Sequence, residues 1–145
     1  MKGARRSDVA IGRWRMTGGA TSERTVAYKN ARSPLVHEHR AVERQTLRSL
    51  RDDGGLCVVD ASTVTADVPW GDAFYTKVRY TLRAVEAGAD DAAATELVVS
   101  WEVEWKPGRS SRLTRGIVGT GAAKGLRRNF ESYAALLDTY LKPKR

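Results

Sequence analysis

Two histidines and one cysteine are the residues of this sequence whose types most readily do chemistry. His37 and His39 stand two positions apart in a candidate strand, so both side chains point to one face and could form a pair of metal ligands. A zinc site needs further ligands, and no third histidine or cysteine stands near them. We interpret the pair as exposed strand residues. Cys57, which stands in no motif, is interpreted as a small core residue.

Patterns for calcium, phosphate or nucleophilic chemistry are also missing from the sequence. Asp60, Asp67 and Asp72 are spaced too irregularly for a calcium loop, and the Gly-Thr-Gly stretch at 119–121 lacks the lysine of a phosphate-binding loop. No nucleophile has a base at a spacing that indicates catalysis. We therefore expect a protein that is not an enzyme and that uses neither a metal ion nor a cofactor.

Aromatic side chains are more numerous than a core of this size requires. Trp101 and Trp105 share one strand face with Val99 and Val103, which predicts a broad apolar wall suited to a flat apolar ligand. Packing of the core alone is the other interpretation of the same residues. The aromatic set consists of Trp70, Phe74, Tyr75, Tyr80, Trp101, Trp105, Phe130, Tyr133 and Tyr140.

The excess of positive over negative charge lies at the end of the chain. The 145 residues carry a net charge of +8, and residues 106–145 hold 10 lysines and arginines against two acidic residues. Such a region attracts anionic surfaces, either phospholipid head groups or nucleic acid, unless it is simply a solvated helix face. No apolar run approaches the ~18 residues that a membrane-spanning helix needs.

Alternating apolar and polar residues predict an antiparallel sheet over most of the chain. The residues from Leu56 to Val59 are apolar at consecutive positions, so the inward face of that strand stays open. The Asp-Asp-Gly-Gly sequence at 52–55 predicts a hairpin turn. The predicted strands are Ala10–Arg15, Arg24–Asn30, Val36–Leu50, Leu56–Thr65, Asp72–Val85 and Thr95–Lys106.

The C-terminal segment changes to a helical period. Leu126, Phe130, Tyr133, Leu137 and Leu141 form one stripe, which predicts a single long helix from about Ser111 to Lys142. Four glycines between residues 116 and 125 predict either a late helix start or a small face that approaches the sheet or a ligand. The predicted fold is α+β, with a helix lying across a curved antiparallel sheet and a pocket between them.

The segment DVPWGD and the Phe74 that follows it resemble the D-V-P-[YF]-G-[DS]-x-F motif of the VASt domain, a StAR-related lipid-transfer-like domain. Residues 28–47, 101–106 and 11–14 are similar to three further segments of that family, with Arg44 where threonine is usual. The resemblance covers about residues 10–142. The motif consists of Asp67, Val68, Pro69, Trp70, Gly71 and Asp72.

This resemblance implies a helix-grip (StART-like) fold that holds a sterol or related lipid and transfers it passively between membranes, or senses it. It also implies a lid over the pocket mouth, with Ser33, Pro34 and Leu35 at the tip of the lid loop. Arg109, Arg112 and Arg115 would face an anionic membrane surface. The expected pocket residues are Phe74, Thr76, Val78, Tyr80, Val99, Trp101, Val103, Phe130 and Tyr133.

The resemblance also sets the expected organisation of the chain. We expect a disordered basic N-terminus over residues 1–8, a lipid-binding domain over 9–142 and a basic tail over 143–145. Because Met1 lies only thirteen residues before Trp14, we expect the domain to be truncated at its N-terminus. The family's GRAM-associated members imply a monomeric cytoplasmic domain that reaches membrane contact sites through segments outside this chain.

Two other classes of function stay open on the sequence alone. One is an enzyme of the cyclase or hot-dog type that uses the same cavity, with Asp60 and Glu43 as candidate catalytic residues. The other is a scaffold or interaction module of a cell-death or stress-signalling protein, or a nucleic-acid binder, acting through the basic C-terminal face. The alternation of tryptophan with glutamate at 101–105 argues against nucleic acid, because a stacking surface prefers basic neighbours.

Overall fold

One curved antiparallel sheet and one long helix make up the described part of the molecule. The computed structural model describes residues 6–32, 36–51, 55–85 and 94–141. The strands follow the order β1-β3-β4-β5-β6-β7, and β2 also pairs with β3. The α+β helix-grip fold predicted from the sequence is confirmed. The elements are β1 (Arg6–Ile11), β2 (Arg15–Gly18), β3 (Thr21–Asn30), β4 (His39–Ser49), β5 (Leu56–Val64), β6 (Phe74–Val85), β7 (Ala94–Trp105) and α1 (Arg112–Leu141).

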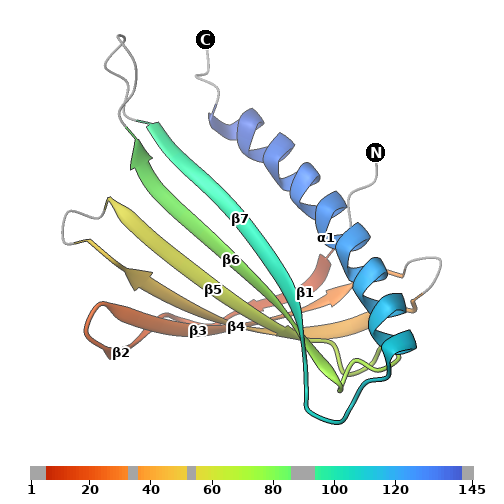
Figure 1. Ribbon diagram of the computed structural model, residues 1–145. Coiled ribbons are helices and arrows are strands. Elements are labelled where there is room, and N and C mark those ends of the chain that lie inside the picture. Colours follow the sequence, from red (N-terminus) through yellow and green to blue (C-terminus); the bar gives the residue numbers. More distant parts are fainter. Residues whose placement is uncertain (1–5, 33–35, 52–54, 86–93, 142–145) are drawn as a thin grey trace.

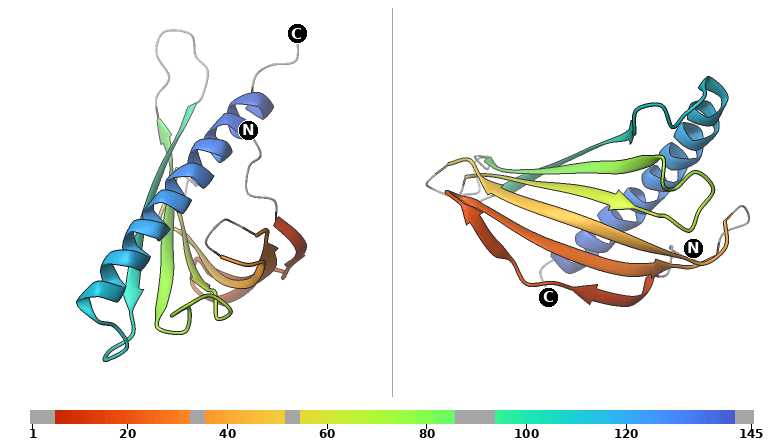
Figure 2. Two further views of the ribbon diagram at one scale, coloured as in Figure 1. Left: turned by 90° about the vertical axis from the view of Figure 1, so that its right-hand side faces the viewer. Right: turned by 90° about the horizontal axis from the view of Figure 1, so that it is seen from below.

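The sheet bends strongly, and α1 runs diagonally across its concave side (Figure 1). Figure 2 shows the same relation from two further directions, with β1 to β4 curling away from the plane of β5 to β7. Strands of 9 to 12 residues in β3 to β7 allow this bend, because each strand adds right-handed twist along its length. The fold therefore has a hollow inner face beneath the helix and an outer face that points away from it.

The register across β5, β6 and β7 decides which side chains share the inner face. Tyr80 lies opposite Val59 on β5 and opposite Val99 on β7. Residues directly opposite each other in an antiparallel pair point to the same face. Val59 and Ala61 therefore belong to the inner face, which settles the orientation of β5 that the sequence left open.

Two predicted strand boundaries and one histidine prediction are wrong. The predicted strand Ala10–Arg15 is instead divided between β1 and β2, and β1 begins at Arg6, inside the range expected to be disordered. The strand predicted from Val36 begins at His39, so the two histidines do not share one strand. The ring nitrogens of His39 lie 3.0 Å from the His37 carbonyl oxygen and 3.1 Å from Asn30 Nδ2. These hydrogen bonds occupy both nitrogens.

A serine cap stands at the start of the helix α1. Ser111 Oγ accepts a hydrogen bond of 3.1 Å from the Thr114 backbone nitrogen, which satisfies one of the free donors of the first turn. The helix extends to Leu141, the last described residue, and the expected end at Pro143 lies outside the described residues. None of the described helices combines the length and the apolar composition needed to cross a bilayer.

The glycine-rich stretch is fully helical and faces open space. A Cβ atom built on Gly116, Gly119, Gly121 or Gly125 would meet no other atom within 4 Å, outside its immediate neighbours. The expected late helix start is therefore wrong, and these glycines do not approach the sheet. Gly71 behaves in the opposite way, since its added Cβ would lie 1.8 Å from the Thr65 carbonyl oxygen.

Burial in the described core is shallow. The core residues are small or only just enclosed, and none of the described large side chains is below 2% exposed. Trp101, on the inner face of β7, remains 38% exposed, and Tyr133 and Leu136, on the helix, remain 45% and 56% exposed. The described side chains therefore do not form a closely packed core beneath the helix. The buried core consists of Val26, Tyr28, Ala41, Val58, Ala61, Ala73, Phe74 and Val78.

The open space around the helical glycines gives a first test. We expect Gly116→Ala and Gly121→Ala each to raise the free energy of unfolding by about 0.5–1 kcal/mol, because alanine restricts the unfolded chain without a clash. Urea denaturation followed by circular dichroism measures the change. Gly71→Ala is the control and should lower stability, since the backbone blocks its Cβ. A loss of stability in both helical variants would contradict the open environment of the glycines.

Candidate functional site

A cavity of about 650 Å³ lies between the inner face of the sheet and the C-terminal half of α1. Small-molecule sites usually occupy about 300–1,000 Å³. Its walls come from the N-terminal segment, from the strands β3 to β7 and from the helix, so distant parts of the chain meet around it. The lining residues are Arg6, Trp14, Arg24, Glu43, Gln45, Val59, Tyr80, Leu82, Leu97, Asn129, Phe130, Ser132, Tyr133 and Leu136.

One side of the cavity is apolar and joins the sheet to the helix. The rings of Tyr80 and Phe130 meet edge to face, with their centroids 6.0 Å apart. Leu82 and Leu97 lie opposite each other on β6 and β7 and extend this wall. The apolar side suits the hydrocarbon body of a ligand.

The other side is a polar network centred on Glu43. This residue is 9% exposed, and Glu43 Oε2 accepts hydrogen bonds of 3.3 Å from Tyr28 Oη and from Thr63 Oγ1. Gln45 Nε2 donates to Glu43 Oε1. A carboxylate that is nearly removed from water needs several donors to remain there, and this one has three.

Two arginines extend the polar side of the cavity. Arg24 Nε donates a hydrogen bond of 2.6 Å to Gln45 Oε1, and its guanidinium lies 4.3 Å from the centre of the Trp14 ring. The Arg6 guanidinium lies 4.2 Å from the centre of the Tyr28 ring. Stacking on aromatic rings holds both guanidinium groups in place at the edge of the cavity.

Burial around the cavity raises the pKa of two tyrosines, Tyr28 and Tyr80. Burial, with a smaller effect of the negative charge on Glu43, raises the pKa of Tyr80 from 10.0 to about 12. Burial likewise raises the pKa of Tyr28 above its usual value, partly opposed by the positive charge of Arg6. Both phenols therefore stay protonated across the neutral pH range, and Tyr28 donates its proton to the hydrogen bond with Glu43.

Of the nine expected pocket residues, Tyr80, Phe130 and Tyr133 line this cavity. Thr76, Val99 and Val103 follow the same alternation along β6 and β7 but do not line it, and Phe74 instead packs against Trp105 with ring centroids 5.2 Å apart. Val78 and Trp101 border a second hollow of about 500 Å³. The cavity lies farther toward β3 and β4 than the sequence predicts.

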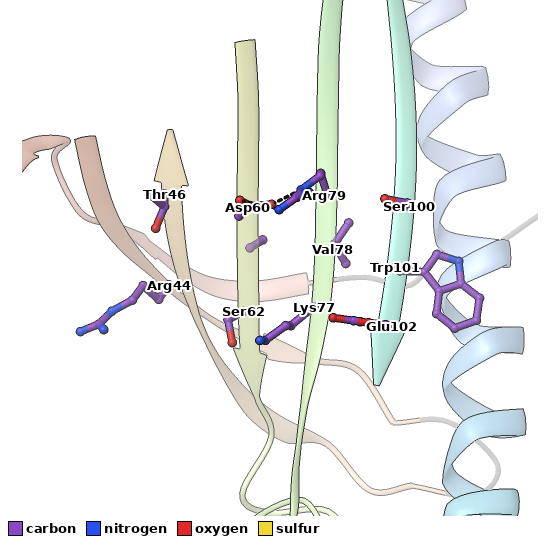
Figure 3. Close-up of a pocket in the computed structure, with 11 residues that line it drawn as sticks. Arg44, Thr46, Asp60, Ser62, Lys77, Val78, Arg79, Ser100, Trp101 and Glu102 are labelled. Atoms are coloured by element: carbon purple, nitrogen blue, oxygen red, sulfur yellow. Dashed lines mark hydrogen bonds and ion pairs between the residues drawn. The ribbon is translucent and has the colours of Figure 1, made fainter. Parts of the chain in front are cut away.

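The second hollow lies on the outer face of the sheet and is lined mainly by polar side chains (Figure 3). There Asp60 points toward Arg79, whose Nε lies 2.6 Å from Asp60 Oδ1, and Asp60 also pairs with Arg48. Hydrogen bonding to Arg79 is the main cause of a lowered pKa of Asp60. Glu43 is on the inner face, so the two candidate catalytic carboxylates are separated by the sheet and cannot act as a pair in one cavity.

The DVPWGD segment forms a compact turn between β5 and β6. The Gly71 backbone nitrogen donates to the Val68 carbonyl oxygen at 2.8 Å, and the Ala73 nitrogen donates to the Trp70 carbonyl oxygen at 2.9 Å. Trp70 has a positive φ of 60° and is 47% exposed. Pro69 is exposed beside it.

The two aspartates of this segment connect the turn to the rest of the fold. Asp67 Oδ2 accepts a hydrogen bond of 3.4 Å from the Arg40 backbone nitrogen on β4, and Asp72 forms an ion pair of 3.2 Å with Arg109. The motif therefore fixes the chain that leads into α1. This structural role explains why the segment does not line the cavity.

The expected membrane-facing arginines lie exposed near the start of α1, but they are not equivalent. Arg109 is paired with Asp72, and Arg115 Nε donates a hydrogen bond of 2.7 Å to Ser110 Oγ, whereas Arg112 opens the first helical turn. Exposure leaves their charges available to an anionic surface. The expected lid residues Ser33, Pro34 and Leu35 lie outside the described residues.

Sequence reasoning missed the polar half of the cavity. Trp14, Arg24 and Gln45 were not singled out, and Glu43 was named only as a possible catalytic group. The signal was present in the alternation of β4, where Glu43, Gln45 and Leu47 share one parity. Among the described residues, no three potential metal ligands come together.

The curved sheet and the helix across it define a helix-grip α+β domain. The family model of the VASt domain, the VAD1 Analog of StAR-related lipid transfer domain, matches residues 1–125. The chain therefore belongs to the VASt family, as its motif indicates. The match ends within α1, before the part of the helix that lines the cavity.

Two relatives agree with this assignment. The chain is 35% identical over 138 residues to the C2 and GRAM domain-containing protein At1g03370 of Arabidopsis thaliana, covering 94% of this chain and 13% of that protein. It is 29% identical over 143 residues to Protein Aster-B of Mus musculus, covering 97% of this chain and 18% of that protein. The chain thus spans less than a fifth of the length of either relative.

The raised pKa of Tyr80 gives a second test. Above pH 10 the unfolded chain loses the phenolic proton while the folded protein keeps it up to about pH 12. The contribution is constant below pH 10, and the free energy of unfolding should fall between pH 10 and 12. Tyr80→Phe removes this part of the fall, which urea denaturation across this range measures. Tyr140→Phe, at a position that is 79% exposed, is the matched control. An equal pH dependence in both variants would contradict the burial of Tyr80.

Proposed function

We propose that this VASt domain binds one lipid molecule, a sterol foremost, in the cavity beneath α1 and carries or senses it at membranes without catalysis. The observation that supports this most directly is the incomplete interior. A volume of about 650 Å³ lies between the inner face and the helix, with apolar side chains on one side and polar side chains on the other, instead of a closed core. A lipid body placed there would complete the core that the side chains leave open.

The magnitudes agree with a carrier. Burying roughly 400 Å² of lipid surface at about 25 cal/mol per Å² contributes about 10 kcal/mol before the costs of association. Those costs leave affinity in the micromolar range, at which a ligand can also be released. A closed, perfectly matched cavity would hold its ligand too tightly for transfer.

The end of the molecule that carries the start of α1 has the properties of a membrane-docking surface. Leu113 and Ile117 are 75% and 53% exposed on the first turns of the helix, among the basic residues Arg112 and Arg115. Trp70 is exposed on the turn that Asp72 and Arg109 join to this end. Apolar side chains surrounded by arginines favour the interface of an anionic bilayer, where each basic residue contributes roughly 1 kcal/mol.

The wider setting follows from the same proposal. We expect the domain to work as a monomer on the cytoplasmic side of membranes, at contact sites reached through other parts of a longer protein. Nucleic acid is not an expected partner. The cyclase-like alternative receives no support from the cavity, because Asp60 lies on the outer face and Glu43 is held by three hydrogen-bond donors.

Extraction of a labelled sterol from vesicles tests the proposed ligand binding. The folded wild-type protein should take up the sterol, and Leu82→Trp, which fills the cavity, should lower uptake by about tenfold through overpacking against the ligand. Thr81→Trp is the matched control, because the adjacent residue of β6 points to the outer face. Absence of uptake by well-folded wild-type protein would count directly against the proposal.

Vesicle co-sedimentation tests the docking surface separately. Neutralising two cations with Arg112→Gln and Arg115→Gln should weaken binding to vesicles that contain anionic lipid by about 30-fold, the equivalent of roughly 1 kcal/mol per residue. Arg127→Gln with Arg128→Gln, farther along the same helix, removes the same charge as a control. Equal weakening by both pairs would show general attraction by the basic helix rather than docking through its first turns.

A further inference from the structure

The charged side chains at the cavity wall do not balance. Two guanidinium groups, those of Arg6 and Arg24, line the cavity together with a single carboxylate, that of Glu43. The remaining lining side chains carry no charge. The lining side chains therefore present an excess of one positive charge to whatever occupies the cavity.

The carboxylate is already satisfied by its neighbours. Glu43 accepts hydrogen bonds from Tyr28, Thr63 and Gln45, so both of its oxygens already have partners among neighbouring side chains of the inner face. Gln45 is fixed by the same arrangement, because its amide nitrogen donates to Glu43 while its amide oxygen accepts from Arg24. These bonds give the side of the cavity near β3 and β4 a defined polarity.

Arg24 is the last residue in this series of hydrogen bonds, and only one of its side-chain nitrogens takes part in it. It gives Nε to Gln45, which leaves Nη1 and Nη2 without a hydrogen-bond partner among the described residues. The Trp14 ring, 4.3 Å from the guanidinium carbon, holds the plane of the group. A guanidinium fixed by one edge presents its other donors in the geometry that matches a carboxylate, sulfate or phosphate group.

We propose that the cavity selects amphiphiles with an anionic head group, bound by Arg24 with Arg6 nearby, over neutral amphiphiles of the same shape. The hydrocarbon body would lie against Tyr80, Leu82 and Phe130, on the apolar side. This inference rests on the proposed lipid binding and specifies the class of ligand. The shared chemistry is a singly or doubly charged oxyanion on an apolar body, which a sterol sulfate or a fatty acid can supply.

Competition binding with three probes tests the selection. Cholesterol, cholesterol sulfate and oleate each compete with a fluorescent sterol or fatty acid for the complete chain, at fixed ionic strength. We expect cholesterol sulfate to bind at least about tenfold more tightly than cholesterol, since hydrogen bonds to charged groups are the stronger ones. Comparison with oleate then distinguishes a sterol body from an acyl chain as the source of the anion.

Two variants attribute the selection to the cavity. Arg24→Gln should lower the affinity for cholesterol sulfate by at least about tenfold more than the affinity for cholesterol, so that the ratio of the two affinities falls toward one. Arg44→Gln is the matched control, because it removes the same charge from the adjacent strand on the outer face.

The outcomes separate this inference from the proposed function. Equal or tighter binding of cholesterol than of its sulfate overturns the inference and leaves lipid binding intact. Equal losses in Arg24→Gln and Arg44→Gln also overturn it, because they indicate general electrostatic attraction. Binding of none of the three probes by folded protein contradicts the proposed function and the inference together.

Discussion

The separation between α1 and the concave face of the sheet is the constraint on which the rest of the structure depends. The helix meets the sheet through contacts such as that of Phe130 with Tyr80, and its glycine-rich half faces open space. The apolar stripe of the helix is consequently only partly covered. Because apolar surface left in water costs free energy, the molecule is suited to take up an apolar guest. The same separation would be a defect in a protein whose stability relied on its own core.

The polar network beside the hollow gives rigidity where packing is weak. Glu43 connects β3, β4 and β5 through Tyr28, Gln45 and Thr63, and a fully bonded buried carboxylate disfavours other registers of these strands. The DVPWGD turn has a similar effect at the far end of the strands, where Asp67 and Asp72 attach it to β4 and to the approach to α1. Hydrogen bonds and an ion pair thus connect the strands around the cavity, while the space beneath the helix is not filled by side chains.

Alternation along the strands separates the charges of this protein into two populations. Asp60, Arg48 and Arg79 pair with one another on the outer face, while Arg24 and Glu43 belong to the cavity wall. A shift of one residue in the register of any of these strands would move its outer-face charges to the inner face and its inner-face charges to the outer face, because successive side chains point to opposite faces. Ion pairs on the outer face contribute little to stability because water screens them.

The sequence by itself determined the elements with a strong local period. The alternation of β6 and β7 and the stripe from Leu126 to Leu137 predicted two strands, the helix and their inward residues, because periodicity needs no knowledge of partners. The family motif predicted the class of domain. Boundaries near the N-terminus were wrong, since short exposed strands such as β1 and β2 carry little hydrophobic signal.

Only the tertiary structure decided where the cavity lies and what charges it carries. The bonds of Glu43 to Tyr28 and Thr63 join residues 15 and 20 positions apart in the sequence, and they exist because the register of β3, β4 and β5 aligns them. The inward face of β5 was set in the same way by its pairing with β6. Register and curvature are properties of several strands together, so no single stretch of residues could specify them.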